Sequence, residues 1–444
     1  MHTILICIDH KWRDLAGYVY VKKLLEKEGY RVILVRNNFE EYYADVYNPQ
    51  AVIMIHLYDK KVSDRAKRMK NRGIRIFLMP TEGIPTLKSI RAFSVGAFSD
   101  LSAVDLQFLW SDEMKKEMLS YNVIDASKIR VVGVPRFDFY KQPLVNILLT
   151  KDQLCEKYNL DSSLPIITWA TNFTHASFFV KNKDFLKKDW KKYKLDKIYD
   201  PEQIPKRDYE SREIIFSSIM RLINEIDNVN LIIKLHPSED HLYYYDRIEK
   251  LNSQIKKRIK IITKEYIWDV LNSTDVLIKR SCTTGIEAWI LKKPTIELKL
   301  NPDEWYFSEE HARGSDIVNT YDELKDKVLF YLKEGAIPDD IMRNREDFLR
   351  KWCYKTDGKS TKRFVSAMLD FLRKDGAVVA KQRKIIEKIK SLLIVFLMNI
   401  TDYRLHDIKI YGLFKKVDKL GRIDKFFHNK DTGYWEKRLK NIYV

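Results

Sequence analysis

The sequence has few cysteines, and they lie far apart. Cys7, Cys155, Cys282 and Cys353 are the four cysteines in 444 residues, with no Cys-x-x-Cys pair and no Cys/His cluster among them. Disulfide frameworks and structural zinc sites both need cysteines at close, repeated spacings. We therefore expect no disulfide framework and no zinc site, and a chain suited to a reducing compartment.

Long hydrophobic runs are also missing. The longest uncharged apolar run, SLLIVFLMNI at 391–400, is about half of the roughly 20 residues that span a bilayer as a helix. The opening residues, MHTILICIDHKW, become polar too early for a secretory signal peptide and instead predict a first strand. These features predict a cytoplasmic protein.

Positive charge is plentiful and unevenly placed. The formal net charge is +18, and residues 376–444 carry 16 Lys and Arg against 7 Asp and Glu, a net +9. A basic, aromatic-rich, locally amphipathic end favours an anionic membrane surface as partner. No zinc-finger, KH, RRM or basic-zipper pattern supports nucleic acid, and a solvated basic face is the remaining alternative. We predict that 376–444 form a basic amphipathic helical extension, peripheral at the inner face of the membrane.

The rest of the chain alternates strand and helix patterns in two series. Strand-like runs of the first series lie at 3–8, 31–35, 51–57, 74–79, 106–110 and 129–134, and those of the second at 165–170, 230–235, 259–263, 275–279 and 294–300. Such alternation predicts parallel, doubly wound sheets. The fold class expected is α/β, with two Rossmann-like domains facing across a cleft, one at 1–145 and one at 146–375.

The stretch LIIKLHPSED joins a buried-looking strand directly to a His-Pro pair. Proline cannot donate to a sheet ladder and biases the preceding residue towards extended geometry. His236 and Pro237 are therefore expected at the carboxyl end of a strand, where open α/β sheets bind their ligands. A surface histidine at a strand end is the alternative reading.

Hydroxyl side chains and a glycine follow the strand DVLIK in the stretch SCTTGIEAWILKKP. A strand-to-helix turn of this kind leaves backbone N–H groups pointing outward at the positive end of a helix, which suits a phosphate. The carboxylate one turn into the helix is placed to reach hydroxyls such as those of a ribose. The alternative is an ordinary capped helix. The residues concerned are Ser281, Thr283, Thr284, Gly285 and Glu287.

Two further polar turns follow predicted strands. Thr171 and Asn172, in ITWATNFTHASF, form a small polar loop on the donor side, although such residues are common in any βα turn. Glu82, in FLMPTEGIP, ends a strand of the first half, and Gly83 lets the backbone pass close to a ligand. A carboxylate there is placed to accept a proton from an acceptor hydroxyl.

Other polar residues near strand ends of the first half also belong to the predicted acceptor side. Asp9, Asp14 and His56 are the substitutes for Glu82 as catalytic base. No Asp-x-Asp pair occurs in the sequence, so we expect no metal ion and no other cofactor.

Taken in order, the short motifs TEG, VGVPRFD, ATNF, KLHP and S-x-T-T-G-x-E-A resemble those of bacterial surface-carbohydrate biosynthesis proteins. These proteins are similar to the GT-B transferases that build capsule and lipopolysaccharide from CMP-activated sugars such as sialic acid and Kdo, and the resemblance covers most of 1–375. In those transferases an acid-acid-Gly motif supplies the general base and a His-Pro motif contacts the nucleotide phosphate. Here Thr81 replaces the first acid, leaving Glu82-Gly83, whereas His236-Pro237 matches fully.

The resemblance implies a metal-independent glycosyltransferase with Glu82 and His236 as catalytic residues. It would move a sugar from a nucleotide-activated donor, with a CMP-sugar favoured, to a growing cell-surface polysaccharide or glycolipid. One alternative is a polyol-phosphate transferase using CDP-glycerol, which shares the His-Pro motif but usually has Asp-Tyr-Ser-Ser where this chain has RSCTTG. A second alternative is a non-catalytic, membrane-associated scaffold in polysaccharide assembly.

Overall fold

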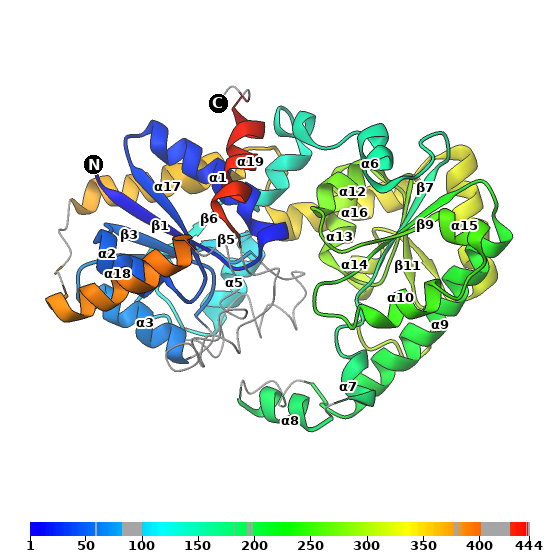
Figure 1. The fold of residues 1–444 in the computed structure, drawn as a ribbon, viewed down its shortest axis with the longest axis horizontal. Coiled ribbons are helices and arrows are strands. Elements are labelled where there is room, and N and C mark those ends of the chain that lie inside the picture. The colour runs from blue at the N-terminus through cyan, green and yellow to red at the C-terminus, as the bar shows by residue number, and fades with distance from the viewer. Residues whose placement is uncertain are drawn as a thin grey trace. The chain divides into compact units, whose positions relative to one another are not determined.

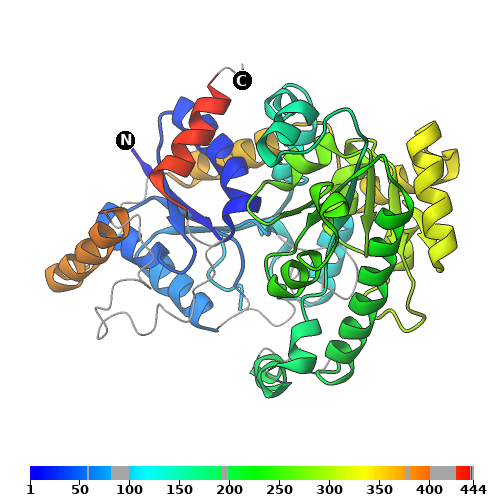
Figure 2. The same cartoon turned by 45° about the vertical axis from the view of Figure 1, so that its right-hand side comes forward.

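The chain divides into two compact units, residues Met1–Ile147 with Trp352–Val444, and residues Leu148–Lys351. The computed structural model describes residues 1–57, 60–81, 100–181, 183–192, 196, 199–376, 381, 383–400, 427–440 and 442. Figures 1 and 2 show that each unit is built around its own sheet with helices on both faces.

A six-stranded parallel sheet forms the centre of the first unit. Its strand order is β2-β1-β3-β4-β5-β6, so the chain changes direction across the sheet between β1 and β3. The strands are β1 (Thr3–Ile8), β2 (Arg31–Arg36), β3 (Ala51–Met54), β4 (Arg75–Leu78), β5 (Leu106–Leu109) and β6 (Ile129–Val131). The α-helices are α1 (Lys11–Lys27), α2 (Glu40–Tyr47), α3 (Lys60–Asn71), α5 (Asp112–Ser120), α17 (Ser360–Asp375), α18 (Ile385–Ile400) and α19 (Asn429–Leu439).

Helix α17 belongs to the first unit, whereas the sequence placed it in the second domain, which was expected to end at residue 375. Its Phe364 and Phe371 rings pack edge-on against Phe108 and Phe77 of the sheet, at centroid distances of 4.6 and 5.6 Å. The carboxylate of Asp138 accepts the backbone N–H groups of Ser360 and Thr361 at 3.0 and 2.7 Å. Asp138 therefore satisfies the first turn of α17, which fixes that helix to the 3-10 segment η3 (Pro135–Tyr140).

The last helix, α19, also packs back onto the first unit. Trp435 is fully buried and meets Phe139 edge-on at 6.0 Å. Lys23 of α1 donates to the carbonyl of Ile442 at 3.0 Å. The helical extension expected at 376–444 is present, in the form of α18 and α19, and its last helix is part of the packed structure of this unit.

The second unit contains another six-stranded parallel sheet, in the order β12-β11-β10-β7-β8-β9. Its strands are β7 (Ile166–Ala170), β8 (Asn230–Lys234), β9 (Ile259–Ile262), β10 (Val276–Lys279), β11 (Thr295–Leu298) and β12 (Asp316–Val318). The direction of winding reverses between β7 and β10, at the centre of the sheet. Alternate residues of β7 enter different cores, Ile167 and Trp169 on one face and Ile166 and Ala170 on the other, as expected for a strand covered on both sides.

Helices cover both faces of this second sheet. One face packs against α9 (Gln203–Glu225), α10 (Leu242–Ile248) and α15 (Tyr321–Glu334). The other packs against α6 (Lys151–Tyr158), α12 (Ile267–Ser273) and α13 (Thr283–Ile290). The remaining helices are α7 (Ala176–Val180), α8 (Lys183–Lys192), α11 (Ser253–Lys257), α14 (Glu309–Ala312) and α16 (Asp339–Cys353).

Each strand-like run identified in the sequence is a strand in the structure, and β12 is an additional one. Residues 135–163, whose composition indicates a linker, contain α6, and residues 181–207, whose Lys-, Asp- and Tyr-rich composition indicates a polar insertion, contain α8 and the start of α9. The Thr320/Glu323 pair, which predicts a capping box at the start of α15, forms the first half of one, because Thr320 Oγ1 accepts the N–H of Glu323 at 3.2 Å. The Glu323 carboxylate accepts the N–H of Asn319 at 2.7 Å instead of that of the N-cap residue Thr320.

Candidate functional site

Polar residues gather at the carboxyl ends of β7, β8 and β10 in the second unit. These three strands are neighbours, with β7 in the middle, and the winding reverses between β7 and β10. In open α/β sheets this switch point is where ligands bind. The sequence-predicted donor residues all follow one of these strands: Thr171 and Asn172 after β7, His236 and Pro237 after β8, and Ser281, Thr283, Thr284, Gly285 and Glu287 after β10.

The His236 ring is half-buried and its orientation is set by its neighbours. The backbone N–H of Ser238 donates to His236 Nδ1 at 3.2 Å, and the backbone N–H of His236 donates to Thr171 Oγ1 at 3.1 Å. A neutral imidazole that accepts at Nδ1 carries its hydrogen on Nε2. His236 is therefore held in the tautomer whose Nε2–H can donate to an anionic oxygen.

Glu239 connects the turns that follow β7 and β8. Its carboxylate accepts the backbone N–H of Phe173 at 2.9 Å and the hydroxyl of Tyr244. Burial raises the pKa of Glu239 to about 7, against the lowering effect of these donors. Sequence reasoning missed Glu239, although it lies in the same HPSED stretch. Among the described contacts of that stretch, the Glu239 carboxylate binds the turn after β7, whereas the Asp240 carboxylate pairs with the exposed Lys181.

Helix α13 begins directly after β10 with Cys282 at the N-cap, and no side chain caps it. The hydroxyl residues Thr283 and Thr284 of its first turn are half-buried. Ser281 is almost fully buried, and its hydroxyl donates to Glu297 at 2.8 Å and accepts the N–H of Ser308 at 3.3 Å. Ser281 thus holds the turn, while Thr283, Thr284 and the uncapped helix start remain the groups suited to bind an anion.

Gly285 is required by a buried ion pair beneath the turn. A Cβ at this position would lie 2.4 Å from Cε of Lys279, whose ammonium pairs with Glu297 in the interior. The two partners face each other directly in the register of β10 and β11. The glycine was expected to serve the anion site, and the structure assigns it a packing reason: α13 comes close to β10 over the Lys279 side chain.

The neighbouring cation, Arg280, ties the β7 and β10 turns together. Its Nη1 donates to Asp208 at 2.6 Å and to the carbonyl of Asn172 at 2.7 Å, and Glu304 accepts from Nη2. Thr171 and Asn172 are 4 % and 6 % exposed, so the β7 turn is a fixed, buried part of the site. Glu287, one turn into α13, is also buried, at 4 %. Sequence reasoning did not identify Lys279 or Arg280, and the unusual Lys-Arg pair at the end of a buried strand was the available signal.

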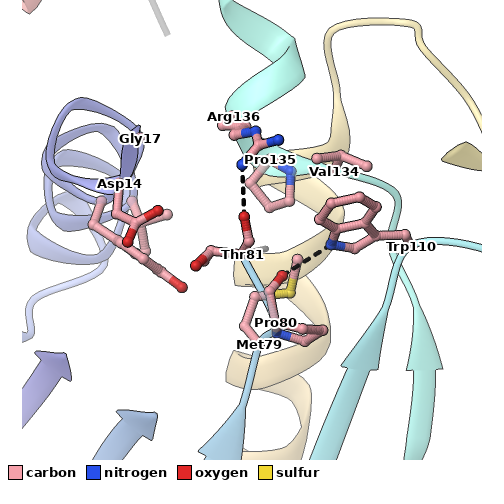
Figure 3. Close-up of a pocket in the computed structure, with 11 residues that line it drawn as sticks. Asp14, Gly17, Met79, Pro80, Thr81, Trp110, Val134, Pro135 and Arg136 are labelled. Carbon is pink, nitrogen blue, oxygen red and sulfur yellow. Dashed lines mark hydrogen bonds between the residues drawn. The ribbon is translucent and has the colours of Figure 1, made fainter. Parts of the chain in front are cut away.

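In the first unit, a small and mainly apolar cavity of about 30 Å³ lies at the carboxyl ends of β4 and β5, beside α1 (Figure 3). Arg136 Nη1 donates to the carbonyl of Thr81 at 2.6 Å, and Trp110 Nε1 donates to the carbonyl of Pro80 at 2.9 Å. The hydroxyls of Tyr18 and Thr81, which line the cavity, are buried and have no hydrogen-bond partner among the described residues. The cavity therefore offers an apolar space with two polar groups available to a ligand.

The predicted acceptor-side residues do not all meet at this cavity. Asp14 lines it, but its carboxylate accepts the N–H of His10 at 3.0 Å and pairs with Arg13 at 2.6 Å. Asp9 also pairs with Arg13, at 3.3 Å, and His56 is half-buried after β3. Glu82 and Gly83 lie outside the described residues. Asp9 and Asp14 are thus shared partners of one guanidinium, which occupies their carboxylate oxygens.

Neither a metal-binding cluster nor a membrane-spanning helix occurs among the described residues. Within these ranges no group of three or more His, Cys, Asp or Glu side chains is arranged to hold a metal ion. Likewise, none of the described helices is both long enough and apolar enough to cross a bilayer.

Comparison with known proteins gives no match to a family model and none to a curated protein. Solved structures are similar. A structure of the wall teichoic acid polymerase TagF has 13% identity and a TM-score of 0.55, covering 84% of this chain and 90% of that one. The S. aureus MnaA–UDP co-structure has 14% identity and a TM-score of 0.54, covering 86% and 100%. A putative UDP-N-acetylglucosamine 2-epimerase from Listeria monocytogenes has 11% identity and a TM-score of 0.52, covering 86% and 99%. At these identities the likeness establishes the fold, and the expected pair of Rossmann-like domains of GT-B type is confirmed.

Proposed function

We propose that the chain is a glycosyltransferase of cell-surface glycan assembly that uses a nucleotide-activated sugar, with a CMP-sugar favoured. The observation that carries the proposal is the convergence of the β7, β8 and β10 turns at the switch point of the second sheet, with His236 held as an Nε2–H donor. The similar structures support a nucleotide as the ligand, because one is a complex of MnaA with UDP and another is TagF with CDPG.

The second unit would hold the donor. His236 Nε2–H and the uncapped start of α13, with Thr283 and Thr284, would stabilise the charge on the leaving phosphate. Glu287, one turn into the same helix, would accept hydrogen bonds from the ribose hydroxyls. Thr171 would act through His236, whose backbone N–H it accepts, rather than by touching the ligand.

The first unit would hold the acceptor, a growing polysaccharide or a glycolipid. The cavity between Thr81, Trp110 and Arg136 is suited to a small apolar group of the acceptor, with the Tyr18 and Thr81 hydroxyls available to an adjacent polar atom. Glu82, the residue after Thr81, remains the proposed base on the strength of the motif alone.

A nucleotide panel tests the proposal. Calorimetry with CMP, CDP and UDP should show binding to the intact chain, strongest for CMP. His236→Ala should weaken that binding about ten- to hundredfold, the value of one hydrogen bond to a charged group of about 1–3 kcal/mol. His2→Ala, which changes an exposed histidine of the first unit, is the matched control and should bind like the wild type.

Adding CDP-glycerol and CMP-sugars to the panel separates the alternatives. Preference for CDP-glycerol over CMP-sugars would favour a polyol-phosphate transferase, for which the TagF fold is a precedent. If no nucleotide binds to a folded chain, the transferase proposal is wrong and the non-catalytic scaffold takes its place.

A further inference from the structure

Among the described residues, helix α18 contacts the first unit along one of its sides. Ser391 Oγ donates to Asp45 of α2 at 2.8 Å, and Arg383, just before the helix, pairs with Asp45 at 3.3 Å and with Glu41. Val395 and Met398 are buried on the same side, at 4 % and 5 % exposure. Both views show α18, in orange, lying along α2 with no other described helix or strand on its outer side (Figures 1 and 2).

The outer side of α18 is apolar and exposed. Six large hydrophobic side chains there are between 45 % and 81 % exposed: Ile385, Ile386, Ile389, Leu392, Leu393 and Phe396. At 3.6 residues per turn these positions fall within a stripe about 120° wide, the width of an apolar helix face that normally meets a partner. Six contiguous exposed aliphatic and aromatic residues are more than the scattered surface hydrophobics of an ordinary monomer.

Lysines lie along both edges of this stripe. The same helical spacing places Lys388 about 40° beyond one edge of the apolar stripe and Lys390 about 40° beyond the other. Glu387, the acid of this segment, lies away from the stripe and pairs with Arg383 at 3.3 Å. A stripe of Ile, Leu and Phe bordered by long cationic side chains matches the boundary between acyl chains and anionic headgroups, because lysine stems follow the apolar layer while the ammonium groups reach the phosphates.

We infer that α18 is a docking helix for an anionic lipid bilayer and lies in the plane of the interface. The helix has 16 residues and does not qualify as a membrane span, so insertion of its outer face is the arrangement that its length allows. Its inner face stays on α2, so docking needs no rearrangement of the first unit. This inference does not depend on the sugar donor or on catalysis.

Point substitutions test the inference better than truncation, because removing the end of the chain would also remove the buried Trp435 from the first unit. Co-sedimentation of the full chain with vesicles of phosphatidylcholine containing phosphatidylglycerol should show binding. Ile389→Ser with Leu393→Ser should reduce the partition coefficient at least tenfold. The two apolar side chains that would move from water into the bilayer are then replaced by polar ones, and their transfer free energy is lost. The control is Leu242→Ser with Val180→Ser, two equally exposed apolar residues of the second unit, 65 % and 60 % exposed.

A separate pair of substitutions tests the contribution of the flanking lysines to vesicle binding. Lys388→Gln with Lys390→Gln should weaken binding to the anionic vesicles severalfold and flatten its salt dependence, with Lys116→Gln and Lys362→Gln as the exposed control pair. Circular dichroism and thermal unfolding must be unchanged in all variants.

Three results would overturn the inference: no vesicle binding by the wild type, equal binding by the Ser variants and the wild type, or equal binding to pure phosphatidylcholine. If light scattering instead shows a dimer that only the α18 apolar variant dissociates, with vesicle binding unchanged, a second copy of the chain is the occupant of the stripe.

Discussion

The backbone N–H of His236 donates to Thr171 Oγ1 at 3.1 Å, joining two strand ends that are 65 residues apart in the sequence. Thr171 Oγ1 also donates to the carbonyl of Lys234, the last residue of β8, at 3.5 Å. One buried hydroxyl therefore ties the start of the HPSED turn to the end of β7. The position of the His236 ring depends on this contact as much as on the proline that follows it.

Thr171→Val should consequently affect the nucleotide site without touching a ligand. The substitution keeps the shape but leaves the His236 N–H without that acceptor, at a cost of about 1–3 kcal/mol in unfolding free energy. Nucleotide affinity should fall together with stability. Thr171→Ser, which retains the hydroxyl, should restore both, and calorimetry with denaturant unfolding measures the pair. Wild-type affinity in the Val variant would mean that Thr171 does not position His236.

Glu239 should make stability depend on pH. Its pKa is raised to about 7 in the folded chain, above the ordinary value of 4.5, because the carboxyl is buried. The folded state therefore holds the proton more tightly than the unfolded state. The stability linked to this proton is fully present below about pH 4.5 and is lost as pH rises through 7.

Glu239→Gln removes this titration and so isolates it. The difference in unfolding free energy between wild type and variant should change by roughly 1–3 kcal/mol between pH 5 and pH 8. The wild type should become less stable relative to the variant as pH rises. Urea unfolding at several pH values measures that difference. A difference that stays constant over this range would place the pKa of Glu239 near its ordinary value.

Gly285→Ala tests the packing of α13 on β10. The added Cβ would lie 2.4 Å from Cε of Lys279, and that side chain is fixed by its pair with Glu297 in the interior. Overpacking of this kind costs about 1–3 kcal/mol. Gly433→Ala in α19 is the control, since a Cβ there meets nothing within 4 Å and alanine favours the helix by up to about 1 kcal/mol. Thermal unfolding should show opposite signs for the two variants.

Much of this architecture was predictable from local pattern, and the exceptions have physical causes. The strands β1 to β11 lie in stretches of the sequence that are mainly apolar over five residues or more, which periodicity detects. Strand β12 has three residues, begins with Asp316 and is only partly buried, so it has no such signal. The placement of α17 depends on contacts of Phe364 and Phe371 with strands more than 200 residues earlier, which a single sequence does not reveal.

The candidate site shows the same division. The His-Pro turn and the hydroxyl turn before α13 were predicted because proline, glycine and hydroxyl residues mark strand ends. Their proximity follows from the strand order, in which β8 and β10 flank β7. The Lys279–Glu297 pair was missed because each residue is a charged interruption in an otherwise apolar strand, and the apolar pattern by itself does not pair such residues. Their equal depth in two neighbouring strands becomes visible only with the register.

The assignment of the base can be tested against the residues that would replace it. Glu82→Gln keeps the side-chain shape but cannot accept a proton, so turnover should fall about 10²- to 10⁴-fold while donor affinity stays nearly constant. Asp14→Asn should behave differently. The Asp14 carboxylate accepts the His10 N–H and pairs with Arg13, so its loss should lower stability, whereas turnover per folded molecule should change little.

Steady-state kinetics with the nucleotide-sugar selected by the panel, together with unfolding curves for each variant, separate these outcomes. A large loss of turnover in Asp14→Asn, with Glu82→Gln active, would transfer the role of base to the α1 side of the cavity, where Asp14 lies beside Tyr18 and Thr81. That result would also predict a dependence on Arg13, because its guanidinium lies 2.6 Å from Asp14 Oδ1 and holds the carboxylate beside the cavity. Arg13→Met would then reduce turnover as well.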